Sequence, residues 1–185
     1  NIFQPIYKVI TAVDGVDGFE KAVKHQPDII LSDVMMPKMS GVDMCSKLKS
    51  NFDTSHIPIV LLTAQTAADY VVQGLLTGAD DYIVKPFNQK VLVTRCNNLV
   101  NSRKLLQKKF ALQLDFEPQI IATNSIDQQL LEKATLIVDK NIDNADFDVN
   151  VFASELCLSR TNLFKKLKGI TGQTPNDFIL NMRLK

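Results

Sequence analysis

The first hundred residues alternate between short apolar runs and segments with helical periodicity. Apolar runs occupy residues 28–32 and 57–64, a shorter one covers residues 81–84, and a β-rich run spans residues 7–12. Unbroken apolar runs of this length are typical of strands buried on both faces, as in a parallel sheet. We therefore expect a strand at each of these four places.

Helical patterns fill the gaps between the expected strands. They cover residues 18–25, 41–50 and 67–79, and Gly78 supplies an end for the last of them. Alternation of strands and helices implies βαβ units, with helices on both faces of the sheet. The predicted fold class of this part is α/β, with a doubly wound parallel sheet.

A longer helix is expected from Asn88 to about Phe110. Its stripe at residues 92, 96, 99, 103, 106 and 110 is apolar except for Arg103. Two interpretations stay open. In one, the first half packs on the sheet and the rest is a solvated spacer; in the other, the stripe pairs with a second copy.

The remaining residues predict a linker and a small all-α domain. Residues 111–125 show no period and contain Pro118, and Ser125 with Gln128 then forms a capping-box pattern. Helical patterns follow, with turns near Asn144, Cys157 and Gly172. The predicted organisation is thus an α/β domain over 1–110, a linker over 111–125 and a helical domain over 126–185.

Composition and charge indicate which environment and which partners the protein has. The 185 residues are 45% hydrophobic and carry a net charge of +1, and no apolar run is long enough to span a membrane, so we expect no membrane contact by this segment. Three widely spaced cysteines suggest reduced thiols in a cytoplasmic setting. From Leu158 onward the sequence contains six basic residues and one acidic residue, which suggests either a polyanionic partner or a solvated helical face.

Three polar residues share one position in the predicted sheet. Asp33, Thr63 and Lys85 each stand at the carboxyl end of an expected parallel strand, the edge where such sheets bind ligands. A carboxylate can attack phosphorus, a lysine offers a point charge for phosphate oxygens, and a hydroxyl can donate a hydrogen bond to one. The set therefore suits phosphoryl chemistry, for which Mg²⁺ normally offsets the charge.

The motifs around these residues identify a family resemblance. "LSDVMMPKMSG", "LLTA" and "GADDYIVKPF" resemble, in order and spacing, the central motifs of response-regulator receiver domains, which have a flavodoxin-like fold. The resemblance implies that Asp33 is the phosphoacceptor, Thr63 the switch hydroxyl and Lys85 the phosphate-binding lysine, with Tyr82 the aromatic that changes rotamer. It also implies Mg²⁺ ligation by Asp33 and by the main-chain carbonyl of Met35, and a cis peptide before Pro86.

One part of the family pattern does not match. Receivers begin with a strand ending in two adjacent acids that hold magnesium, whereas "NIFQPIYKV" corresponds to the end of the first helix. Asp14 and Asp17 are tied to glycines in a turn and are no substitute. We therefore expect that the sequence begins inside the fold, with the first strand missing; the alternative is a pseudo-receiver that has lost phosphorylation.

A second constellation lies near the C-terminus. Ala153, Cys157 and Leu163 have the spacing of a helix-turn-helix unit, and Ser159 is placed to cap its second helix. Leu163, Phe164 and Leu167 are expected to face inward. Base-reading side chains near a helix start, with lysines further along for phosphates, suit a recognition helix in the major groove. The candidate DNA-binding residues are Arg160, Thr161, Asn162, Lys165, Lys166 and Lys168.

This segment also resembles a known family. "SRTNLFKKLKGITGQTPNDFI" is similar to the first helix-turn-helix of an AraC-type DNA-binding domain, whose second unit is absent from this sequence. Cys157 stands where a glycine is common, so it must tolerate a left-handed backbone or the turn must differ. A receiver followed by such a domain resembles both hybrid two-component regulators and free-standing response regulators.

Together the two resemblances predict a phosphorylation-controlled transcription regulator. It would be a phosphoacceptor rather than a freestanding enzyme, with a histidine kinase domain as its partner in cis or in trans. We expect a homodimer, paired through the face formed by residues 67–99, that binds double-stranded DNA. The alternative is a pseudo-receiver used only for dimerisation, with phosphate-independent DNA binding.

Overall fold

A computed structural model of the chain describes residues 2–64, 78–112, 121–122 and 124–184. The chain divides into two compact units, residues 1–102 and 103–185. Residues 67–77 of the helix expected at 67–79, and most of the expected linker, lie outside the described residues. Across the described part of the chain, no helix combines the length and the hydrophobicity that crossing a bilayer requires.

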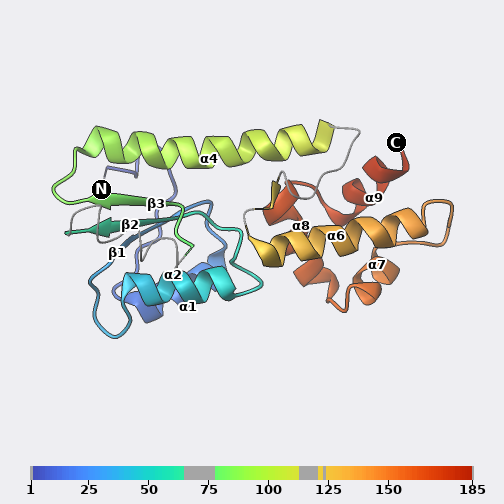
Figure 1. The fold of residues 1–185 in the computed structure, drawn as a ribbon, viewed down its shortest axis with the longest axis horizontal. Coiled ribbons are helices and arrows are strands. Elements are labelled where there is room, and N and C mark those ends of the chain that lie inside the picture. Colours follow the sequence, from blue (N-terminus) through green and yellow to red (C-terminus); the bar gives the residue numbers. More distant parts are fainter. Residues whose placement is uncertain (1, 65–77, 113–120, 123, 185) are drawn as a thin grey trace. The chain divides into compact units, whose positions relative to one another are not determined.

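The first unit is built on a parallel sheet of three strands (Figure 1). Strands β1 (Ile30–Asp33), β2 (Ile59–Thr63) and β3 (Asp81–Val84) lie in the order β1-β2-β3. The register pairs Asp33 with Leu62, and Thr63 with Val84. The three strands therefore end side by side at one edge.

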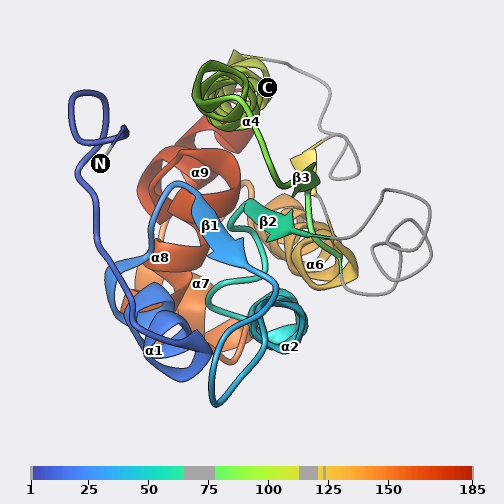
Figure 2. The same ribbon diagram turned by 90° about the vertical axis from the view of Figure 1, so that its left-hand side faces the viewer.

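Helices cover both faces of this sheet, as Figure 2 shows. On one face lie α1 (Gly15–His25) and α2 (Gly41–Ser50), whose Ala22, Cys45 and Leu48 are buried against Ile59 and Leu61. The first turns of α4 (Gln89–Leu112) cover the other face, where Leu92 and Cys96 pack on Val60 and Ile83. These layers confirm the predicted doubly wound α/β architecture.

The predicted strand at residues 7–12 is wrong. The sheet in the described part of the chain contains β1, β2 and β3, and residues 8–12 have no assigned secondary structure. A strand needs a neighbour that accepts and donates its main-chain hydrogen bonds, which the pattern of one segment cannot reveal. The other three expected strands are confirmed: β3 has the expected bounds, and the ends of β1 and β2 are shifted by one or two residues.

The second unit is helical. It contains α6 (Ser125–Lys140), α7 (Val149–Glu155), α8 (Arg160–Thr171) and α9 (Pro175–Arg183). Its core includes Phe152 and Phe178, fully buried with stacked rings whose centroids lie 6.0 Å apart. The cap of α6 corrects a prediction, because Asn124 rather than Ser125 accepts the first-turn hydrogen bond, from the N–H of Asp127.

The last turns of α4 belong to this second unit. Arg103 Nη2 and Gln107 Nε2 donate hydrogen bonds to the carbonyl of Gly169, at 3.1 and 3.0 Å, and Phe110 is buried. The second half of this helix is therefore not the solvated spacer that one interpretation of the sequence predicts. Arg103, which interrupts the apolar stripe, instead satisfies a main-chain carbonyl close to the end of α8.

Candidate functional site

The candidate site stands at the carboxyl edge of the sheet. Asp33 is the last residue of β1, Thr63 the last of β2, and Lys85 follows the last residue of β3. The N–H of Lys85 donates to the Thr63 carbonyl at 2.6 Å, and the N–H of Val34 donates to the Leu62 carbonyl at 2.9 Å. Main-chain hydrogen bonds thus continue one residue beyond the strands and fix the places where the polar side chains emerge.

An ion pair joins two of the predicted residues. Lys85 Nζ donates to Asp33 Oδ2, although the two residues lie 52 positions apart. Each side chain is 37% exposed, so the pair is open to an incoming group. The peptide between Lys85 and Pro86 is cis, as the family resemblance implies.

The other oxygen of Asp33 is held by the chain itself. Its Oδ1 accepts a hydrogen bond from the N–H of Met35 at 3.1 Å. Burial raises the pKa of Asp33, but the Lys85 ammonium and the Met35 N–H stabilise the ionised form more, so the pKa lies below its ordinary value. The carboxylate is therefore ionised at neutral pH, the form that can act as a nucleophile.

Close backbone packing sets the loop after Asp33. A Cβ added to Gly41 would lie 2.0 Å from the Asp33 carbonyl oxygen, so only glycine fits where α2 begins. Ser40 caps this helix by accepting from the N–H of Asp43. The Ser-Gly pair of "MMPKMSG" thus returns the chain tightly onto the end of β1.

Thr63 and Tyr82 occupy different surroundings. Thr63 is 1% exposed at the end of β2. Tyr82, in β3, is partly buried against the cluster formed by α1, α2 and the sheet. The structure therefore places Thr63 at the same edge as Asp33 and Lys85, and Tyr82 beside the core on the α1–α2 face.

The residues present supply part of a magnesium site. The Asp33 carboxylate and the Met35 main-chain carbonyl are oxygen donors of the kind that Mg²⁺ prefers. Within the described residues, however, no three His, Cys, Asp or Glu side chains gather where they could hold a metal ion. The donors fit Mg²⁺ in kind, but they do not complete a ligand set.

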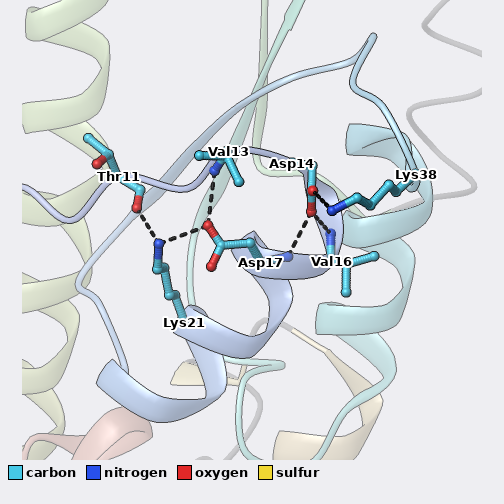
Figure 3. A network of polar contacts seen from close by, with 7 residues as sticks. All are labelled: Thr11, Val13, Asp14, Val16, Asp17, Lys21 and Lys38. Atoms are coloured by element: carbon cyan, nitrogen blue, oxygen red, sulfur yellow. Dashed lines mark hydrogen bonds and ion pairs between the residues drawn. The ribbon is translucent and has the colours of Figure 1, made fainter.

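The side chains of Asp14 and Asp17 form hydrogen bonds and ion pairs at the start of α1 (Figure 3). Asp14 caps α1 and pairs with Lys38, and the N–H of Asp17 followed by the Lys38 ammonium hold the pKa of Asp14 below its ordinary value. Asp17 accepts from Lys21 and from the N–H of Val13. Both acids were expected in a turn, but the helix begins earlier than expected, so Asp14 is its N-cap and Asp17 lies in its first turn. The sequence did not reveal the role of Lys38.

In the second unit a short turn joins α7 to α8, at the place where the sequence predicts a helix-turn-helix. Ala153 and Leu163 are buried, and Ser159 caps α8 by accepting from the N–H of Asn162. Cys157 has a φ of 56°, so this residue does adopt the left-handed backbone for which glycine is the usual choice. The turn between α7 and α8 therefore forms with a cysteine where a glycine was expected.

Most of the candidate DNA-binding side chains lie on the outside of α8. The exposed ones are Arg160, Thr161, Asn162, Lys165 and Lys168. Phe164 was expected to face inward but is 41% exposed, with the Lys168 ammonium 5.3 Å from its ring centroid. A hollow of about 630 Å³ adjoins these residues and is lined by Val149, Arg160, Thr161, Phe164, Thr174, Pro175 and Asn176.

Lys166 corrects the predicted set. Its side chain is fully buried, and its Nζ lies 2.6 Å from Asp127 Oδ1, on a side chain that is also fully buried. An ammonium enclosed in this way cannot reach a DNA phosphate. The burial of Lys166 could have been predicted from helical spacing, because it stands three residues after Leu163 and four before Ile170, both of which are buried.

Fold and site together define a phosphate-accepting signalling module of the α/β class. Residues 2–97 match the response regulator receiver domain family, and the chain belongs to that family. Its first unit is therefore the receiver domain of a two-component system, the kind of domain that takes a phosphoryl group from a histidine kinase.

Relatives and solved structures agree with this assignment. The chain is 44% identical over 185 residues to "Histidine kinase P4" of Formosa agariphila, and it spans 14% of the length of that protein. A response regulator receiver domain protein from Clostridium thermocellum is 28% identical, with a TM-score of 0.51 over 57% of this chain and 84% of that one. The receiver domain of sensor histidine kinase PA1611 from Pseudomonas aeruginosa, 24% identical with a TM-score of 0.50, covers 54% of this chain and 83% of its own. That last crystal structure holds a magnesium ion in its active site cleft.

Proposed function

We propose that Asp33 is the phosphoacceptor of this receiver and that α7 and α8 bind double-stranded DNA, so that phosphorylation controls transcription. The observation that carries the first part is the ion pair between Asp33 and Lys85 at the strand ends. An ionised, half-exposed carboxylate beside a fixed cation suits an attack on phosphorus, because the cation can pass to the phosphoryl oxygens as the carboxylate loses its charge.

The transfer balances as a simple displacement. An Asp33 carboxylate oxygen forms a bond to phosphorus while the bond from phosphorus to the imidazole nitrogen of a phosphohistidine breaks, and the imidazole takes up a proton. Lys85 then holds the phosphoryl oxygens, the Thr63 hydroxyl donates to one of them, and Tyr82 changes rotamer. Mg²⁺, when bound, would offset phosphoryl charge next to the Asp33 carboxylate and the Met35 carbonyl.

The proposal extends to the protein's partners and setting. The kinase domain acts in cis or in trans in the cytoplasm, and two phosphorylated copies pair and place their α8 helices on one operator. The exposed basic residues of α8 and the left-handed turn at Cys157 support the DNA-binding part. The alternative of phosphate-independent binding lacks such support, because the Asp33–Lys85 pair is intact.

Replacing Asp33 tests the phosphoacceptor. We expect Asp33→Asn to abolish phosphoryl uptake from acetyl phosphate in the presence of Mg²⁺, since an amide oxygen is a poor nucleophile. Uptake is read as the fraction of phosphorylated protein on a phosphate-affinity gel. The matched control is Asp43→Asn, which changes an exposed aspartate near the start of α2 and should leave uptake unchanged. Full uptake by Asp33→Asn would refute the assignment.

DNA binding is tested on α8. We expect Arg160→Ala to reduce the preference for a selected sequence by about 1–3 kcal/mol, because a base-reading contact is lost. Lys168→Ala should weaken selected and random DNA alike and lower the salt slope by about one. Fluorescence anisotropy at several salt concentrations measures both, with Lys140→Ala at the end of α6 as the control. Equal loss on both DNAs for Arg160→Ala would contradict a base-reading role.

A further inference from the structure

The loop between β1 and α2 contains a strained residue. Lys38 has a φ of 62°, in the left-handed region that a lysine rarely adopts. Its Nζ lies 2.5 Å from Asp14 Oδ2, as Figure 3 shows. An unusual backbone conformation that ends in a specific contact needs surroundings that hold it in place.

Asp14 is a fixed anchor for that lysine. It is 4% exposed, and its Oδ1 accepts from the N–H groups of Val16 and Asp17, each at 3.0 Å. These bonds cap α1 and orient the carboxylate, leaving Oδ2 for Lys38. The lysine therefore binds to a group that the start of a helix has already placed.

A second contact joins the same two segments. A Cβ added to Gly15 would lie 2.3 Å from the Met39 carbonyl oxygen, so the backbone of Met39 rests directly on the start of α1. Residues 38 and 39 are thus held to α1 by a charged side chain and by close backbone packing. Two unlike contacts at adjacent positions fix the loop more firmly than either could alone.

The other parts of this loop touch the candidate site. Met35 donates its N–H to Asp33 Oδ1 at 3.1 Å, and Gly41 donates its N–H to the Val34 carbonyl at 2.9 Å. Only Met36 and Pro37 separate Met35 from Lys38, a span of roughly 10 Å at full extension. Lys38 and Met35 thus belong to one short segment that contacts α1 at one end and Asp33 at the other.

We propose that the Asp14–Lys38 pair clamps this loop, which makes Lys38 a positioning residue for phosphoryl uptake at Asp33. The inference rests on the proposed function of Asp33. The clamp sets the Met35 N–H that orients the Asp33 carboxylate, and with it the Met35 carbonyl, which would be a ligand of Mg²⁺ if the ion bound here. Asp14 acts in the same way from the other side of the pair.

The neighbouring pair in Figure 3 provides a matched control. Lys21 Nζ lies 2.8 Å from Asp17 Oδ2, and the side chains of Lys21 and Lys38 are 37% and 68% exposed. Lys21, however, joins α1 to itself and to the Thr11 carbonyl, and it makes no contact with the loop after Asp33 among the described interactions. Its removal changes the same kind of ion pair without releasing the loop.

The test compares phosphoryl uptake from acetyl phosphate over a range of Mg²⁺ concentrations. Lys38→Met removes the ammonium, and Asp14→Ser removes the carboxylate but keeps a helix cap. We expect each to lower uptake at limiting Mg²⁺ by about tenfold, the lower end for groups that orient metal ligands. The double variant should be no worse than either single one, Lys38→Arg should restore uptake, and Lys21→Met should match the wild type.

Wild-type uptake by Lys38→Met, or equal loss in Lys21→Met, would overturn the clamp while leaving Asp33 as phosphoacceptor. If the wild type takes up no phosphoryl group at Asp33, the proposed function fails, and hydrogen exchange then decides the clamp. The amides of Met35, Met39 and Gly41 should exchange faster in Lys38→Met than in Lys21→Met. Unchanged exchange at these amides would refute the clamp as well.

Discussion

At the scale of single residues, Asp33 shows how one charge can serve both stability and chemistry. Its pKa lies below the ordinary value of about 3.9 because of Lys85 and Met35. A carboxyl with a lowered folded-state pKa stabilises the fold fully above its unfolded pKa, and that stability is lost as pH falls through the folded pKa. Near neutral pH the ionised carboxylate therefore stabilises the fold through Lys85, and it is in the form that the proposed phosphoryl transfer requires.

The three cysteines differ sharply in their surroundings. Burial raises the pKa of Cys45 to about 11, and burial also raises that of Cys96, whereas Cys157 is exposed in the turn before α8. Since the thiolate is the reactive form, only Cys157 should react quickly.

We therefore predict that a thiol reagent such as DTNB modifies one cysteine in the native protein near neutral pH and all three in denaturant. Cys157→Ser should abolish the fast native reaction, and Cys45→Ser should preserve it. Fast labelling that survives in Cys157→Ser would show that Cys45 or Cys96 is accessible.

At the scale of elements, the buried pair of Asp127 and Lys166 joins the first turn of α6 to the middle of α8. The Asn124 side-chain amide donates to the second carboxylate oxygen at 2.9 Å, so both oxygens of Asp127 are bound. A buried charge is tolerated only when it is paired and hydrogen-bonded. This pair therefore sets how α6 and α8 meet, while the exposed face of α8 stays free for another role.

Breaking this pair from either side should be costly. We expect Lys166→Met and Asp127→Asn each to destabilise the second unit by about 3–5 kcal/mol, because one buried group loses its partner. Replacing both residues with apolar ones should recover most of that loss. Because the chain contains no tryptophan, urea unfolding is followed by far-UV circular dichroism, which gives the free energy of unfolding of each variant.

The partly exposed pair of Asp17 and Lys21 is the control for this prediction. Lys21→Met should lower the free energy of unfolding far less than Lys166→Met does, because solvent screens a partly exposed pair. Equal costs for Lys166→Met and Lys21→Met would mean that water reaches the Asp127–Lys166 pair.

Helical periodicity was sufficient to predict that Asp127 and Lys166 are buried. The alternation of residue types was not sufficient to predict every strand. Asp127 and Lys166 both lie on buried faces of amphipathic helices, which the spacing of Leu130, Leu131 and Leu163 indicates. Lys166 was predicted to contact DNA because it is basic, but that prediction did not take into account which face of the helix it lies on. The segment at residues 7–12 has strand-like residues, but pairing depends on a partner that its own pattern does not contain.

At the scale of the whole molecule, topology explains why the site could be predicted and its clamp could not. Parallel strands end at one edge, so the order of motifs alone brings Asp33, Thr63 and Lys85 together. The contact between Asp14 and Lys38 depends on a left-handed lysine and on where a loop crosses the start of α1. Neither feature has a local signature in the sequence.

The two units divide the proposed work of the chain. The receiver unit holds the candidate phosphoacceptor site, and the second unit carries exposed basic residues on α8. Under the proposed function, phosphorylation changes the first unit and DNA affinity reports the result in the second. The state of Asp33 is therefore the quantity on which the account depends.

The most direct measurement is to locate the phosphoryl group. The protein is treated with acetyl phosphate and Mg²⁺, the acyl phosphate is reduced with borohydride, and the peptides are mapped by mass spectrometry. The account predicts that Asp33 alone is converted, within the peptide that includes residues 28–41. Conversion of another aspartate, such as Asp14 or Asp17, or of none, would contradict it.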